Sequence, residues 1–250
     1  MNFWQYIKYF FLVIFVPNSR VRMEWQMLRL LNKDRKDFNL STLSMQYDLR
    51  RVARNHSRDM AEKDYFEHVN LKGDDPADRL KLARVTDTIS GENLAKIGGY
   101  DNPVEEAEIG LMRSPGHRAN ILNKNFNCVG VGIVKSKEGV YYFTQNFARR
   151  YLRFTKKVPK RILLKKGLKI RGVCIEKVFG IYYKVTNEFT GETVFRNTVK
   201  TVNHGFDFDI NFTETGRFEI EFYVLLSANP SDAVLSNSFA VKVKKWWFWF

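Results

Sequence analysis

The hydrophobic pattern of this chain changes period near residue 128, and this change constrains the fold more than any other feature. Before it, apolar residues recur at the spacing of one helix face, including Leu49, Val52, Ala53, His56 and Met60. After it they alternate at a spacing of two, from Val129 to Ile133 and from Val140 to Phe147. Helices followed by a β-hairpin predict a mixed α/β domain that ends near Arg150.

Three further features place the helices before the hairpin. Apolar spacing predicts one helix from Met23 to about Asp37, and Ser41 is expected to begin the helix that carries the apolar stripe. Asn102 and Ser114 each precede a proline, which is typical of a helix cap followed by the first helical residue. The two helices that they cap are expected to run to about residues 113 and 122.

The second half of the chain has a different character. From Leu168 to residue 250 short β-rich runs are separated by glycine, proline and asparagine, and no helix of convincing length is expected. About seven short strands over residues 168–250 predict an all-β immunoglobulin-like sandwich. The basic segment 151–167 contains Pro159 and is expected to be a linker or the edge strand of this sandwich.

Composition excludes several classes of protein. The chain has 250 residues and is 44% hydrophobic, so it can bury a core and is not disordered. Its two cysteines, Cys128 and Cys174, exclude a disulfide-rich scaffold and a four-cysteine zinc module. A disulfide between them stays open, but two unpaired small hydrophobic residues are favoured because they fall in different predicted domains.

The positive charge is concentrated in one segment. The net charge is +14, and residues 153–171 carry nine lysines and arginines without an acidic residue. Such a run predicts attraction to an anionic surface or polymer, and a solvated linker and strand face is the alternative. No zinc-finger, basic-zipper or RNA-binding signature accompanies it, so nucleic acid is not an expected partner.

Residues 1–20 form a signal-like or anchor segment. The apolar run from Tyr9 to Val16 is too short to span a bilayer and ends at Pro17. It predicts a secretory signal, and therefore a protein that is secreted or attached to the cell surface. An Ala-x-Ala cleavage site is missing, so an uncleaved anchor or a buried arm stays open. The aromatic run Trp246–Phe250 is expected either to cap the core or to lie at an interface.

Four motifs carry a family resemblance: Tyr65-Phe66-Glu67-His68, Gly91-Glu92-Asn93-Leu94-Ala95, the stretch from Ser114 to Leu122, and Val129-Gly130-Val131-Gly132. With them, residues 24–148 resemble the CAP superfamily of cysteine-rich secretory, antigen 5 and pathogenesis-related proteins, also called SCP-like, in the short form common in bacteria. The resemblance implies a three-layer α-β-α sandwich over residues 24–150. The predicted fold class is thus α+β, with a CAP-like domain followed by the all-β domain.

The resemblance also implies a cleft with two histidines and two acidic residues, which binds zinc or another divalent ion in some members. His68 matches the first histidine, Glu92 one acid and His117 the second histidine. Ser114 stands at the position of the other acid, so the set is incomplete. The residues expected to substitute for that acid are Glu105, Glu106 or Glu108.

Two imidazoles and a carboxylate also make chemical sense without the resemblance. They are ligands that a divalent ion accepts, and three of them leave one position open for water. His68, Glu92 and His117 are therefore the expected metal ligands if a zinc or another divalent cation binds, and the expected catalytic residues if the cleft has activity. The alternative is that the two histidines only hydrogen-bond to Glu92 and hold the cleft wall.

Other motif residues have simpler expected roles. Asn93 is expected to satisfy backbone groups near the cleft, and Arg118 either lies exposed beside the cleft or pairs with an acid such as Glu67. Gly130 and Gly132 lie in an alternating strand, where glycine allows close approach of another backbone, so a phosphate cradle is not expected.

These observations favour an exported protein whose cleft binds a small ligand, which is a lipid, a peptide or a divalent metal. The all-β domain is expected to attach it to a surface or partner. The alternative is a divalent-metal-dependent hydrolase of peptide or cell-wall material, and a purely architectural surface protein is a third reading. No Gly-x-Ser-x-Gly elbow is present, and Cys128 begins a strand, so a serine or cysteine protease is not expected.

Overall fold

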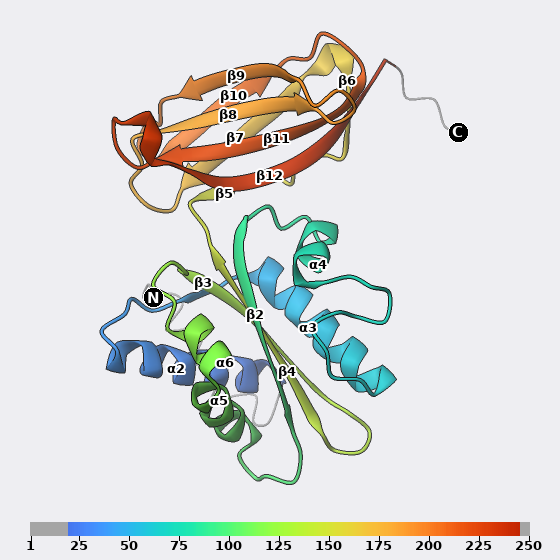
Figure 1. Ribbon diagram of the computed structural model, residues 1–250, viewed down its shortest axis with the longest axis vertical. Coiled ribbons are helices and arrows are strands. Elements are labelled where there is room, and N and C mark those ends of the chain that lie inside the picture. The colour runs from blue at the N-terminus through green and yellow to red at the C-terminus, as the bar shows by residue number, and fades with distance from the viewer. Residues whose placement is uncertain (1–19, 246–250) are drawn as a thin grey trace. The chain divides into compact units, whose positions relative to one another are not determined.

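The computed structural model describes residues 20–245, so the signal-like segment up to residue 19 and the aromatic run Trp246–Phe250 lie outside the described residues. Within this range the chain divides into two compact units (Figure 1). The first contains residues 20–85 and Ile89–Arg149, and the second contains Thr86–Thr88 and the residues from Arg150 onward. Each unit is described by itself.

The first unit is built on a four-stranded sheet. Its strand order is β1 (Ser44–Met45), β3 (Cys128–Lys135), β4 (Tyr141–Arg149) and β2 (Ile89–Ile97). β1 runs parallel to β3, whereas β3 and β4 form the expected antiparallel hairpin and β2 pairs antiparallel with β4. The motif Gly91–Ala95 therefore lies on β2, which is an edge strand of this sheet.

Helices cover both faces of the sheet (Figure 1). α3 (Tyr47–Lys63) packs on β3 and β4, and α4 (Pro76–Leu82) lies beside it. α2 (Arg20–Asp37), α5 (Pro103–Arg113) and α6 (Pro115–Ile121) cover the other face and contact one another. This arrangement bears out a fold of mixed helices and sheet for this part of the chain.

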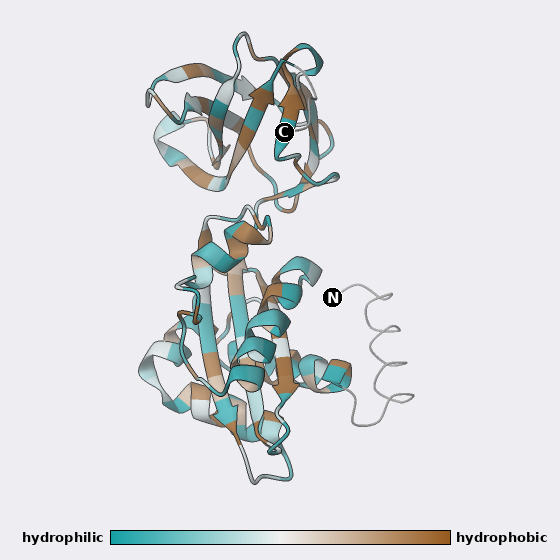
Figure 2. Cartoon of the chain, turned by 90° about the vertical axis from the view of Figure 1, so that its right-hand side faces the viewer, coloured by the Kyte–Doolittle hydropathy of each residue, from teal (hydrophilic) through white to brown (hydrophobic). Residues whose placement is uncertain are grey.

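The apolar stripe predicted on α3 is confirmed, because its five members are all buried, while the outward face of α3 is hydrophilic (Figure 2). The expected start at Ser41 is wrong, since α3 begins at Tyr47. Ser44 and Met45 are extended and pair with Cys128 and Val129, which keeps them out of the helix. Asn102 and Ser114 do cap α5 and α6, but neither side chain makes a capping hydrogen bond.

The two strand glycines explain how closely α3 approaches the sheet. A Cβ atom on Gly130 would lie 2.1 Å from the backbone nitrogen of Arg50, and one on Gly132 would lie 2.2 Å from that of Arg54. No side chain fits at such distances. The expectation that these glycines permit close backbone approach is confirmed.

The second unit consists of two sheets around one hydrophobic core. One sheet has the order β10 (Gly205–Ile210), β7 (Leu168–Cys174), β5 (Leu152–Phe154). The other has the order β6 (Arg161–Leu163), β12 (Ala233–Lys244), β11 (Gly216–Leu225), β8 (Gly180–Asn187), β9 (Thr193–Val199). The core takes residues from both sheets, such as Ile170, Phe206 and Phe222. β5 and β6 both fall within the basic segment 151–167 and form edges of different sheets.

Residues 86–88 complete the second unit. Asp87 forms an ion pair with Arg150, with Oδ2 and Nη2 separated by 2.5 Å. The side chain of Asn237 on β12 donates to Thr86 Oγ1 over 2.9 Å, and the backbone nitrogen of Ser238 donates to the carbonyl of Thr86 over 3.0 Å. A short segment that precedes β2 in the sequence is therefore hydrogen-bonded along β12.

Both cysteines are buried and free, as favoured from the sequence. Among residues 20–245 no helix combines the length and the apolar character that a membrane span requires.

Candidate functional site

The candidate site begins with His68 and Glu92. His68 lies in the loop after α3, and Glu92 lies on the edge strand β2. His68 Nδ1 is 2.8 Å from Glu92 Oε1, and the side chain of His68 is 50% exposed whereas that of Glu92 is 2% exposed. The imidazole therefore links a buried carboxylate to the protein surface.

Arg79 is the partner that the sequence analysis missed. From α4, its Nη2 donates to Glu92 Oε2 over 2.6 Å. Its Nη1 donates to the backbone carbonyls of His68, over 2.6 Å, and of Asp74, over 3.0 Å. Both oxygens of Glu92 are therefore engaged, one by an imidazole and one by a guanidinium. The Asp75-Pro76 start with Asp78 signals this helix through its capping box, but no pattern in the sequence marks Arg79 as a partner of Glu92.

The second histidine is placed by asparagines. Asn93 Nδ2 donates to the backbone carbonyl of His117 on α6 over 3.0 Å and to Gln145 Oε1 over 3.1 Å. Asn120 Nδ2 donates to the backbone carbonyl of Glu92 over 3.2 Å and to Asn93 Oδ1 over 2.9 Å. These bonds hold α6 against β2. The expected role of Asn93 in satisfying a backbone group is confirmed.

The two imidazoles have opposite electrostatic environments. The hydrogen bond to Glu92 raises the pKa of His68, against burial and the nearby Arg79. Burial lowers the pKa of His117, and the charge of His68 lowers it further. The site therefore contains one imidazole whose pKa is raised and one whose pKa is lowered.

The side chains of three other candidates make no hydrogen bond to those of His68, Glu92 or His117 within residues 20–245. Ser114 caps α6 without a side-chain capping bond. Arg118 is exposed, which is one of the two placements expected for it. Its guanidinium lies over the ring of Phe38, 4.9 Å from the ring centroid. Of the three glutamates expected to replace the missing acid, Glu108 is the buried one, and it accepts a hydrogen bond from Gln145 over 2.9 Å. It thus reaches the cleft motif only through Gln145 and Asn93.

His56 is a core residue, as its place on the apolar stripe predicts. It is 1% exposed, and its Nε2 lies 3.0 Å from the carbonyl of Glu67. Burial lowers its pKa. This bond ties α3 to the loop that carries His68.

The structure does not gather the three expected metal ligands into one cluster. Among residues 20–245 no group of three or more histidine, cysteine or acidic side chains is arranged to hold a metal ion. Glu92 is instead hydrogen-bonded to His68 Nδ1 through one oxygen and to Arg79 Nη2 through the other, so it orients the His68 ring.

Helices on both faces of a sheet, with His68, Glu92 and His117 at its edge strand, define an α-β-α protein with a polar group at the sheet edge. Comparison with known proteins points to one family. Residues 28–147 match the model of the cysteine-rich secretory protein family, CAP, so this part of the chain is similar to that family.

Two curated relatives come from Bacillus subtilis (strain 168). The chain is 38% identical over 120 residues to the uncharacterized protein YkwD, which is 48% of this chain and 46% of that protein. It is 37% identical over 128 residues to the uncharacterized membrane protein YlbC, which is 51% of this chain and 35% of that protein. The chain therefore spans less than half the length of either relative.

A solved structure is also similar, that of an extracellular protein containing a SCP domain from Bacillus anthracis str. Ames. The identity is 32%, the TM-score is 0.47, and the match covers 52% of this chain and 41% of that one.

Proposed function

We propose that this is an exported protein whose cleft at His68, Glu92 and His117 binds a small organic ligand. One observation carries the proposal: a half-exposed imidazole rests on a buried carboxylate–guanidinium pair, beside a second imidazole of opposite protonation preference. Buried polar groups of this kind fix the direction of the exposed one. The raised pKa of His68 favours its charged, donating form, and the lowered pKa of His117 favours its neutral form, which donates or accepts.

This arrangement selects the chemistry of the ligand. A protonated imidazole favours a carboxylate or a polarised carbonyl oxygen, since hydrogen bonds to charged groups are the stronger ones. A neutral imidazole beside it accepts from or donates to an amide or hydroxyl group. Peptides and lipids with a carboxyl end share this chemistry, and either would place its polar end against β2.

The test follows the histidine rings by isotope-edited NMR. The probes are N-acetyl-alanyl-alanine and laurate, added separately to the full chain. We expect at least one probe to shift the ring signals of His68 and His117. His68→Ala should weaken its binding about tenfold, the effect of one lost charge-assisted hydrogen bond, and His117→Ala should weaken it about fivefold, the effect of one lost neutral hydrogen bond. Glu67→Gln is the matched control beside the cleft and should bind as the parent does.

Zinc chloride is the decisive competing probe. Uptake of about one equivalent by the parent chain, lost in both His68→Ala and His117→Ala, would overturn the organic-ligand proposal and favour the metal-dependent hydrolase instead. Absence of ring shifts with both organic probes would also count against it.

The role of the second unit is part of the same proposal. Its strand orders, β10-β7-β5 facing β6-β12-β11-β8-β9, support an immunoglobulin-like sandwich. Such sandwiches commonly display or attach a neighbouring domain, and this one carries the basic segment 153–171. We assign it attachment to an anionic surface.

Export rests on the signal-like residues 1–20 of the sequence. Cell fractionation of the parent chain and of a chain that lacks these residues tests it. The parent should leave the cytoplasm, and the shortened chain should stay there.

A further inference from the structure

The pairing of β6 with β12 brings together two basic segments that are far apart in the sequence. β6 belongs to the basic segment 153–171, and β12 is the last strand of the second unit. The two run parallel, with Arg161 opposite Lys242 and Leu163 opposite Lys244. The backbone nitrogen of Lys242 donates to the carbonyl of Lys160 over 2.9 Å, which fixes this register.

Three cations form a row across neighbouring strands. Lys242 lies between Arg161 on β6 and Arg217 on β11. The residues next to them, such as Ile162 and Val243, are buried in the core, so alternation places the three cations on the outer face of the sheet. Like charges directly opposite one another destabilise a sheet. The row therefore costs stability unless an anion lies over it.

Acidic residues of the same unit lie near only one end of this row, the end on β11. Arg217 pairs with Glu188 at 2.5 Å, and Glu219, further along β11, accepts from Ser238 Oγ over 2.7 Å. The ion pairs found within residues 20–245 leave Arg161 and Lys242 without an acidic partner. Uncompensated positive charge thus accumulates toward the β6 edge.

The flanking sequence extends this positive edge. Lys165 and Lys166 follow β6 and are exposed, as is Lys245 after β12. The sequence then continues with the aromatic run Trp246–Phe250. Cations directly beside tryptophan and phenylalanine are typical of a protein segment at a lipid headgroup interface.

We propose that the β6 edge of the second unit, comprising Arg161, Lys242, Lys244 and the exposed lysines beside them, binds a membrane that contains anionic phospholipid. The proposal rests on the attachment role assigned to this unit above and specifies its surface. The aromatic residues favour a lipid membrane over a soluble anionic polymer, because a polymer offers no apolar layer for them.

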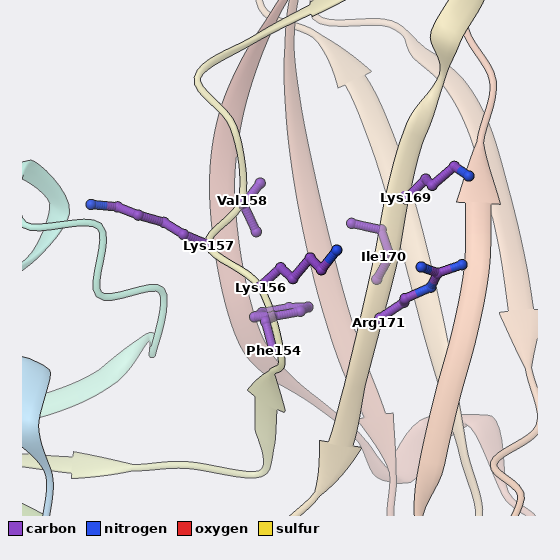
Figure 3. Close-up of a pocket in the computed structure, with 7 residues that line it drawn as sticks. All are labelled: Phe154, Lys156, Lys157, Val158, Lys169, Ile170 and Arg171. Atoms are coloured by element: carbon purple, nitrogen blue, oxygen red, sulfur yellow. The ribbon is translucent and has the colours of Figure 1, made fainter.

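A second cationic site in the same unit supplies a matched control. Between Phe154 and Arg161 the chain crosses from one sheet to the other and leaves a pocket of about 120 Å³ beside β7 (Figure 3). It is lined by three apolar residues together with Lys156, Lys157, Lys169 and Arg171. Lys157 points away from the opening (Figure 3). These lysines are exposed, as Arg161 and Lys242 are, but they are not in the cross-strand row.

The experiment is cosedimentation of the full chain with vesicles. One set contains phosphatidylglycerol in phosphatidylcholine, and the other contains phosphatidylcholine alone. Each cation near an anionic surface contributes roughly fivefold to binding, so Arg161→Gln, Lys242→Gln and Lys244→Gln together should weaken binding to the anionic vesicles by about 100-fold. Lys156→Gln, Lys157→Gln and Lys169→Gln together should weaken it less than tenfold.

Two further readouts make the outcome decisive. Thermal unfolding should show the β6-edge variant to be at least as stable as the parent, because its like charges are removed. The ring signals of His68 and His117 should respond to the cleft probes alike in both triple variants, so failure of membrane binding is separable from failure of the cleft. Equal weakening by the two triple variants, equal binding to the neutral vesicles, or binding to soluble polyphosphate but to neither vesicle, would overturn the proposal.

Discussion

Glu92 is buried with a hydrogen-bond partner on each of its oxygens, His68 on one and Arg79 on the other. The side chains of Arg79 and Glu92 are 8% and 2% exposed, so neither charge is screened by water. Removal of one member of such a pair leaves the other without compensation, which costs about 3–5 kcal/mol. His68 shares this carboxylate, so the orientation of the exposed ring depends on a pair that the ligand itself does not touch.

The pKa of His68 tests this dependence. In Glu92→Gln we expect the pKa of His68 to fall from its raised value to its ordinary value or below, because the amide removes the hydrogen bond to a charge and leaves Arg79 unopposed. NMR titration of the His68 ring measures it. Glu67→Gln is the control, since Glu67 is the last and smallest contributor to the pKa of His68. An unchanged pKa in Glu92→Gln would contradict the assignment.

The same bond sets a pH dependence of stability. Because folding raises the pKa of His68, its contribution is fully present below the ordinary value of 6.5 and is lost as the pH rises through the folded value. The difference in unfolding free energy between the parent and Glu92→Gln should therefore shrink above that range. Urea unfolding at a series of pH values measures it, and a difference that grows with pH would contradict it.

Glu108 is the second buried carboxyl group of the first unit. Burial raises its pKa to about 8, and the negative charge of Asp34 on α2 raises it further. The folded chain therefore holds this proton more tightly than the unfolded chain, so stability falls as the pH rises from the ordinary value of 4.5 to about 8.

Glu108→Gln should remove the loss of stability that the parent shows as the pH rises. We expect the variant to be more stable than the parent at pH 8 and close to it at pH 4.5, because the amide keeps the shape and carries no charge to desolvate. Thermal unfolding at both pH values measures this. Glu105→Gln, at an exposed position of the same helix, should show no such difference, and a Glu108→Gln variant less stable than the parent at pH 8 would refute the account.

The residues of the cleft could be predicted from the sequence only where a motif names them. His68, Glu92, Asn93 and His117 stand in recognisable motifs. Arg79 does not, because its role depends on a salt bridge between two different elements, and a helical arginine in a polar segment looks like any solvated one. The metal set proposed from these motifs left out this guanidinium, which occupies one oxygen of Glu92.

At the scale of elements, the period of the hydrophobic pattern predicted long segments that bury one face. It did not predict short segments. It located α3 and the β3–β4 hairpin. It did not show α4, which has seven residues, or β2, whose burial does not alternate. It also missed β1, whose two residues are extended only because β3 lies beside them. Such elements depend on tertiary contacts rather than on their own pattern.

The contact between α3 and β3 is the most closely packed one that the glycines reveal. Gly130→Ala should destabilise the chain by about 3 kcal/mol or more, because its Cβ would meet the backbone of Leu49 and Arg50 at 2.1 Å. Gly110→Ala in α5 is the matched control. Nothing lies within 4 Å of its Cβ, so the higher helix propensity of alanine should stabilise the chain by about 0.5–1 kcal/mol. Chemical unfolding measures both, and equal effects would contradict the packing argument.

At the scale of the whole molecule, the second unit is discontinuous in sequence. The pair of Asp87 and Arg150 is buried, with side chains 2% and 8% exposed. No hydrophobic or charge pattern in the sequence indicated that residues 86–88 pair with β12, since three residues carry no periodicity.

Asp87→Asn tests the importance of this segment. It leaves the charge of Arg150 buried, and we expect a loss of about 3–5 kcal/mol from the second unit. Hydrogen exchange followed by mass spectrometry should show faster exchange at residues 86–88 and 233–238. Arg171→Gln breaks the exposed pair with Asp207 instead and should cost less than about 1 kcal/mol. Unchanged exchange in Asp87→Asn would show that the segment is dispensable.

The discontinuity has a consequence for biosynthesis. A growing polypeptide emerges from the ribosome in sequence order, so Thr86–Thr88 leaves the exit tunnel long before β12 is made. Its donors and acceptors face water until translation reaches Asn237 and Ser238. The second unit therefore cannot close until β12 has emerged, because Asn237 on this strand pairs with Thr86, which lies 151 residues earlier in the sequence.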